Sequence, residues 1–167
     1  MNTMSDNPTS DADNQQERFS ESLCNYLTGF ADGEGSFNIS FRKRKDYRYP
    51  WKISACFNIS QKEKPILQLC QKHLRCGTLR SRPDGVWYYE VNNLKDLINL
   101  IIPFFKKFPF LSQKKQRDFL IFRKIVSIMN DRDHLKKEGI ERILELRRNM
   151  NDGGKRKYSE QEILNAF

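Results

Sequence analysis

The segment Leu27-Thr28-Gly29-Phe30-Ala31-Asp32-Gly33-Glu34-Gly35-Ser36-Phe37 joins a helix-like pattern to a strand-like one. Before it, apolar residues recur at helical spacing. After it, Phe37, Ile39 and Phe41 alternate with polar residues as in a half-buried strand. These patterns predict a helix that ends close to Gly33. Gly29 and Gly33 then share one helix face, where the missing side chains let another backbone approach closely.

Two acids, Asp32 and Glu34, stand where the predicted helix ends. An ordinary helix cap followed by solvated acids would account for them. Carboxylates at a helix C-terminus are unfavourable for the helix dipole, however, and a divalent cation would compensate their charge. The residues by themselves leave both interpretations open.

The nine residues Leu27–Gly35 resemble the LAGLIDADG motif of homing endonucleases. They depart from it at Thr28 and at Glu34, and Glu34 is still a carboxylate. The resemblance implies the single-motif, homodimeric, group I intron-encoded type. It also implies the α+β fold of that family, in which helices cover one face of a curved antiparallel four-stranded sheet and DNA binds the other.

The rest of the chain fits this fold. Alternating patterns predict strands near residues 37–44, 51–60, 78–82 and 86–91. Helical spacing predicts a helix from a capping box at Ser60–Glu63 to about His73, and helices near 94–107, 114–129 and 138–149. The order is α-β-β-α-β-β-α with additional C-terminal helices, which leaves one sheet face bare.

The bare face is predicted to be basic and rich in amides. A solvated face of mixed charge is the ordinary alternative. Arginine and lysine can read guanine and asparagine can read adenine, while a two-stranded ribbon fits the major groove. The expected DNA-binding residues are Asn38, Ser40, Arg42, Arg44, Lys52, Asn58, Ser60, Arg80, Arg82, Trp87 and Tyr89.

Composition favours a polyanionic partner, because 30 basic residues outweigh 21 acidic ones and give a formal charge of +9. A merely soluble basic surface is the alternative. We expect a disordered leader over 1–18, one domain over 19–150 and a basic tail with a short helix over 151–167. No apolar run is long enough to span a bilayer and no targeting signal is evident, so no membrane partner is expected. The four cysteines lack metal-binding spacing and are expected to be reduced thiols.

One motif in one domain supplies only half of a helix pair, so we expect a homodimer. Its contacts would come from the motif helix, at Leu27, Gly29, Phe30, Asp32 and Gly33.

The resemblance implies further roles for single residues. Glu34 and Gly33 would hold Mg²⁺, Gln61 would order the attacking water, and Lys114 would offset transition-state charge, with Lys115 as the close alternative. Glu34, Gln61 and Lys114 are thus the expected catalytic residues.

The resemblance also implies the reaction. It is hydrolysis of both strands of a long pseudo-palindromic double-stranded DNA site, across the minor groove, leaving short 3′ overhangs. The gene would lie in a group I intron of an organelle, a chloroplast or mitochondrion. The alternative on the same fold is a maturase that binds intron RNA, or a DNA-binding protein that does not cut.

Overall fold

The computed structural model of the chain describes residues 9–45 and 50–166. The expected α-β-β-α-β-β-α order is confirmed. The elements that form it are α1 (Thr9–Glu34), β1 (Gly35–Lys43), β2 (Trp51–Gln61), α2 (Lys64–Leu74), β3 (Thr78–Ser81), β4 (Trp87–Val91) and a last helix in three parts, α3 (Leu94–Asp96), η1 (Leu97–Ile101) and α4 (Ile102–Lys107). The elements that follow are α5 (Gln113–Asn130), η2 (Asp133–Leu135), α6 (Lys137–Arg148), η3 (Asn151–Gly153) and α7 (Glu160–Leu164).

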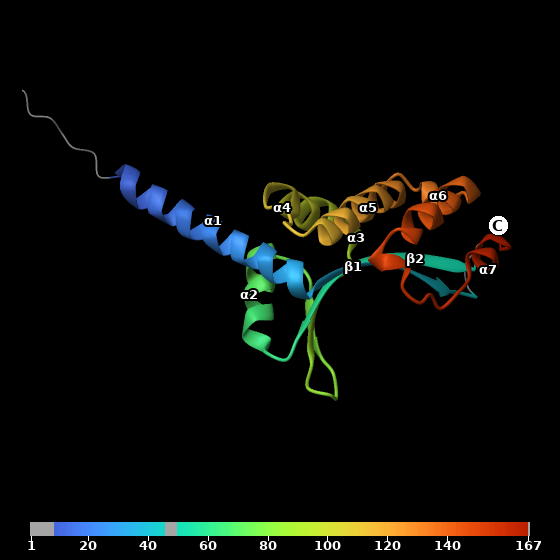
Figure 1. Ribbon diagram of the computed structural model, residues 1–167, viewed down its shortest axis with the longest axis horizontal. Coiled ribbons are helices and arrows are strands. Elements are labelled where there is room, and N and C mark those ends of the chain that lie inside the picture. Colours follow the sequence, from blue (N-terminus) through green and yellow to red (C-terminus); the bar gives the residue numbers. More distant parts are fainter. Residues whose placement is uncertain (1–8, 46–49, 167) are drawn as a thin grey trace, which may run out of the picture.

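The four strands form one antiparallel sheet in the order β1-β2-β4-β3. Strong alternation of burial along β1 and β2 sends their apolar residues to one face. Helices α4, α5 and α6 lie together on one side of β1 and β2, while α1 projects from the body (Figure 1). None of the helices in the described ranges is long and apolar enough to cross a membrane.

An aromatic cluster fills the space between the sheet and the helices. Phe37 of β1 lies 5.1 Å from Phe57 of β2 and 5.0 Å from Phe122 of α5, measured between ring centroids. Phe105 of α4 stacks on Phe110 at 4.5 Å. Full burial of each such ring stabilises the fold by about 1.5–3 kcal/mol, so this cluster holds the sheet against α4 and α5.

Helix α1 begins at Thr9, inside the segment expected to be a disordered leader. Residues 1–8 of that leader lie outside the described residues. Extending an existing helix costs far less than nucleating one, which gives a physical reason for the longer helix.

Two other local expectations differ from the structure. The capping box at Ser60–Glu63 is wrong, because α2 begins after Glu63 without a side-chain cap and has a proline in its first turn. The expected helix over 94–107 exists, but five residues, Leu97–Ile101, form a π-helical segment within it.

The C-terminal residues pack on the body. Tyr158 lies 4.8 Å from Trp51 between ring centroids, and Ile163 of α7 is buried. Lys43 of β1 forms a 2.5 Å ion pair with Glu162. The described part of the tail expected over 151–167 therefore sits beside the free edge of β1.

Candidate active site at the end of α1

The inner face of α1 is anchored in the core of its own chain. Leu27 and Ala31 are buried, and the buried Thr28 hydroxyl donates to the carbonyl oxygen of Phe108 at 3.3 Å. Leu27 was expected at the dimer interface. That expectation is wrong, since its side chain is 2% exposed within the single chain. Phe30 is half-buried and also packs against this core.

The outer face of α1 is open. Gly29, Gly33 and Glu34 are exposed, and Tyr26 beside them is 56% exposed. A Cβ atom placed on Gly29 or Gly33 would meet nothing within 4 Å in the described part of the chain. These two glycines are therefore not required by packing inside one chain. By contrast, a Cβ on Gly35 would lie 2.5 Å from the carbonyl oxygen of Ala31, so the passage from α1 to β1 needs a glycine there.

Asp32 is used inside the chain. Its carboxylate accepts a hydrogen bond from the Ser112 backbone N–H at 3.0 Å and another from the Ser112 hydroxyl. Ser112 is itself the N-cap of α5 and accepts from the backbone N–H of Lys115 at 3.3 Å. Asp32 thus ties the end of α1 to the start of α5, whereas the sequence placed it among the dimer contacts.

The two candidate lysines point to different places. The Lys115 ammonium donates to the carbonyl oxygen of Gly35 and is half-buried. Burial lowers the pKa of Lys115, an effect opposed by the carboxylates of Asp32 and Glu34 among others. Lys114 forms a 2.5 Å ion pair with Asp152 and its side chain is 62% exposed. The first choice from the sequence was Lys114, but Lys115 is the lysine that lies at the motif. Lys115 is the third residue after the N-cap Ser112 and faces the core, whereas Lys114 is exposed. Had the cap been recognised from the sequence, this position would have favoured Lys115.

Gln61 is the last residue of β2 and is half-buried. Its side-chain oxygen accepts from the backbone N–H of Lys62 at 2.7 Å. Its role in ordering water stays a prediction.

A single chain offers a small set of metal donors here. Within residues 9–45 and 50–166, no three His, Cys, Asp or Glu side chains gather where they could hold an ion. The exposed Glu34 carboxylate and the Gly33 carbonyl are oxygen donors of the kind that Mg²⁺ and Ca²⁺ prefer. The donor chemistry fits a hard divalent cation.

Most of the expected DNA-binding residues share the sheet face that none of the described helices covers. We call this the open face. Pairing aligns Asn38 with Cys56 and Asn58 with Glu90, which puts alternate residues of neighbouring strands on the same side. Arg44 lies just beyond β1, where its backbone N–H donates to the carbonyl oxygen of Pro50 at 2.7 Å. The open face contains Asn38, Ser40, Arg42, Lys52, Asn58, Ser60, Arg80 and Arg82 of the expected set.

Trp87 and Tyr89 are wrong assignments to this face. Tyr89 is fully buried and its hydroxyl donates to the carbonyl oxygen of Cys76 at 3.0 Å. Trp87 packs against the core, and the Lys64 ammonium lies 4.3 Å from its ring centroid. The reason is strand register, because Tyr88 pairs with Ser60 and thereby takes the open side.

Tyr88 and Glu90 of β4 also lie on the open face, and the sequence analysis did not assign them to it. The Arg82 guanidinium lies 4.3 Å over the ring of Tyr88, and Glu90 forms an ion pair with Arg80. The charge of Glu90 was the available signal, because a carboxylate in β4 belongs on the solvated side and parity then buries Tyr89.

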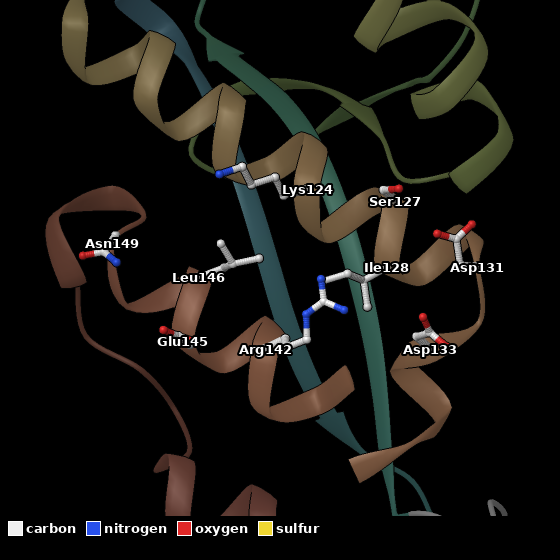
Figure 2. A pocket seen from close by; sticks show the side chains of 9 residues that line it. All are labelled: Lys124, Ser127, Ile128, Asp131, Asp133, Arg142, Glu145, Leu146 and Asn149. Atoms are coloured by element: carbon white, nitrogen blue, oxygen red, sulfur yellow. The ribbon is translucent and has the colours of Figure 1, made fainter. Parts of the chain in front are cut away.

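A groove of about 590 Å³ lies elsewhere, between α5 and α6 (Figure 2). Lys124 and Asp131 line it from the α5 side, and Arg142 and Glu145 from α6. Its mixed charge and its distance in the fold from the motif give it no evident part in the candidate site.

Comparison with known proteins identifies the family. The family model "LAGLIDADG endonuclease" matches residues 27–126, which is more than half of the chain. The chain belongs to this family.

Individual relatives agree. "Probable intron-encoded endonuclease 2" of Neurospora crassa is 34% identical over 132 residues, covering 77% of this chain and 29% of that protein. "Homing endonuclease I-ApeII" of Aeropyrum pernix is 30% identical over 149 residues, covering 85% of this chain and 88% of that protein. The solved structure "I-SmaMI bound to uncleaved DNA target in the presence of Calcium ions" superposes with a TM-score of 0.74 at 28% identity, over 83% of this chain and 46% of that one. The chain thus spans less than a third of the Neurospora relative and less than half of I-SmaMI.

Proposed function

We propose that this chain is a site-specific double-strand DNA endonuclease that acts as a homodimer. The observation that carries the proposal is the exposed Gly29, Gly33 and Glu34 face of α1, located in a chain of the LAGLIDADG endonuclease family. The open face, with Arg80 and Arg82, supplies the surface for DNA.

The proposed dimer rests on the open outer face of α1. Gly29 and Gly33 leave room for a second helix at close range, and one chain presents a single motif. A twofold axis between two copies of α1 would bring the two Glu34 residues together and would match a pseudo-palindromic target. I-ApeII, which this chain covers over 88% of its length, has a similar size.

Glu34 and the Gly33 carbonyl would hold a divalent cation, which we propose to be Mg²⁺. Such an ion, when bound, stabilises charge on a phosphoryl oxygen and makes water a better nucleophile. Gln61 would orient the water. Lys115 rather than Lys114 would lie near the scissile phosphate, where its positive charge offsets the charge that develops in the transition state.

The remaining details of the reaction follow the family. We propose cleavage across the minor groove with short 3′ overhangs. We also propose that the gene belongs to an organellar intron; the name of the Neurospora relative supports the intron. An archaeal relative, I-ApeII, means that the family extends beyond organelles.

The first experiment finds the substrate. A randomised DNA library is incubated with the protein and Mg²⁺, and the cut molecules are sequenced. We expect a long, nearly palindromic consensus. If the protein binds duplex DNA but yields no cut molecules, it is a DNA-binding protein that does not cleave.

The second experiment tests the site. Glu34→Gln should lower the cleavage rate by at least about 10²-fold, because it removes a charged ligand, while binding of the selected DNA stays near that of the parent. Glu141→Gln, an exposed carboxylate on α6, is the matched control and should cut normally. A Glu34→Gln protein that cuts as fast as the parent would refute the assignment.

A further inference from the structure

A second hollow lies at the free edge of the sheet. It has a volume of about 270 Å³ and is lined by Ser40, Phe41, Arg42, Arg147, Lys157 and Tyr158. β1 is an edge strand, and Ser40 and Arg42 belong to the open face. Arg147 comes from α6, and Lys157 and Tyr158 from the segment before α7. We call this hollow the edge pocket; it continues the open face around β1.

The edge pocket concentrates positive charge. Three of its six lining side chains are cationic and none of these six is acidic. The neighbouring acids already have partners, since Glu162 pairs with Lys43 at 2.5 Å and Glu160 with Arg148 at 2.6 Å. Arg156 adds a further charge nearby, because its guanidinium donates to the carbonyl oxygens of Arg147 and Met150 at 2.9 and 3.1 Å.

Arg147 is the central residue of the edge pocket. Its guanidinium lies 5.0 Å over the ring of Phe41, a cation–π contact. Its Nε atom is buried and has no hydrogen-bond partner among the described residues. Burial, together with the charge of Arg156, lowers the pKa of Arg147 to about 10, and the carboxylate of Glu160 opposes this shift. Arg147 also lines the hollow, where an anionic oxygen would stabilise this partly buried cation.

We propose that the edge pocket binds a backbone phosphate of duplex DNA that also lies on the open face. This inference rests on the proposed function and extends it. Arginine, lysine and serine are the side chains that usually bind DNA phosphates, and such contacts position the protein without reading bases. The packing of Tyr158 on Trp51 at 4.8 Å holds the segment with Lys157 in place before DNA arrives.

The test measures binding of the full chain to a mixed-sequence DNA duplex without Mg²⁺, over a range of salt concentrations. Arg147→Gln and Lys157→Gln should each weaken binding about three- to tenfold at low salt. Each should also reduce the slope of log K against log salt by about 0.9, as expected for one lost phosphate contact. Arg147→Lys keeps the charge and should recover most of the affinity. Lys124→Gln removes one charge from the groove of Figure 2 and should bind as the parent does.

Three outcomes would overturn the inference. These are unchanged affinity and slope in both Gln variants, an equal loss in Lys124→Gln, or a loss seen only with duplex RNA of the same length. Lys157 is exposed, so its variant remains informative if Arg147→Gln folds poorly. A parent protein that does not bind duplex DNA at all would refute the proposed function and this inference together, whereas unchanged variants refute the inference alone.

Discussion

At the scale of single residues, Lys115 combines two properties that a purely structural lysine seldom has. Its ammonium group is half-buried, and it contacts the backbone of Gly35, the last residue of the motif. Keeping a cation there costs desolvation energy, which the nearby carboxylates of Asp32 and Glu34 partly offset. A group of this kind is well suited to stabilise a phosphate whose negative charge increases during reaction.

We predict that Lys115→Gln lowers the cleavage rate by about 10²-fold, whereas Lys114→Gln changes it little. Single-turnover kinetics on the selected target would measure both. The two substitutions remove the same charge from adjacent positions, so each is the control for the other. If Lys114→Gln instead lowered the cleavage rate more than Lys115→Gln, Lys114 would be the active-site lysine, as the sequence first suggested.

The pH dependence of the cleavage rate should also report the charge of Lys115. The folded pKa of Lys115 lies below the ordinary lysine value of 10.5 because of burial. If the charged form assists cleavage, activity is present below that pKa and is lost as the pH rises through it. We therefore expect the alkaline fall in rate to occur below pH 10.5 and to be absent in Lys115→Gln. An identical alkaline fall in the variant would contradict this role.

Tyr89 gives a prediction of the opposite kind. Its hydroxyl donates to the carbonyl oxygen of the half-buried Cys76, and burial raises the pKa of Tyr89. Tyr89→Phe should cost about 1 kcal/mol of unfolding free energy and leave DNA affinity unchanged. Tyr88→Ala should instead weaken DNA binding with little effect on stability. Urea unfolding and DNA titration of both variants distinguish the two faces of β4.

The sequence predicted Asn38, Arg42, Arg80 and most other open-face residues correctly, because alternation in β1 and β2 is regular. It failed in β4, where three aromatic residues in a row, Trp87 to Tyr89, obscure the period of two. Choosing between Lys114 and Lys115 needed the position of the Ser112 cap, which depends on its tertiary contact with Asp32. Side-chain contacts between distant segments were the information that pattern analysis lacked.

At the scale of elements, helix ends and strands were predicted where their signals are local. The end of α1, expected near Gly33, falls at Glu34. The π-helical segment in the helix after β4 and the uncapped start of α2 were not predicted.

The junction of α1 with α5 is the element contact most open to test. Asp32→Asn replaces an acceptor that serves both the backbone N–H and the hydroxyl of Ser112, and we expect a loss of about 1–2 kcal/mol in unfolding free energy. Ser112→Ala should cost about 1 kcal/mol through the lost cap. A double-mutant cycle in urea should show coupling of at least about 0.5 kcal/mol. Additive effects would mean that the two side chains act independently.

At the scale of the whole molecule, the proposed dimer separates folding from assembly. Gly29→Leu meets no neighbour in the single chain and replaces a poor helix former, so monomer stability should rise by up to about 1 kcal/mol. The same side chain would keep a second α1 at a distance. Sedimentation analysis should show a monomer at concentrations where the parent is dimeric, and cleavage should be lost with it. Lys124→Leu, on exposed α5 surface, should leave the dimer intact, and a dimeric Gly29→Leu protein would exclude this interface.

Two bonds set the tilt of α1. Thr28 contacts Phe108 and Asp32 contacts Ser112, so the two contacts lie one helical turn apart on α1 and four residues apart in the loop before α5. In a twofold dimer, this tilt determines how far apart the two Glu34 carboxylates stand. The spacing of the two Glu34 carboxylates would then set the number of base pairs between the two cuts. The side chains of the sheet would have no part in it. Retargeting the protein by exchanging open-face side chains should change which DNA is cut and preserve the stagger of the cut.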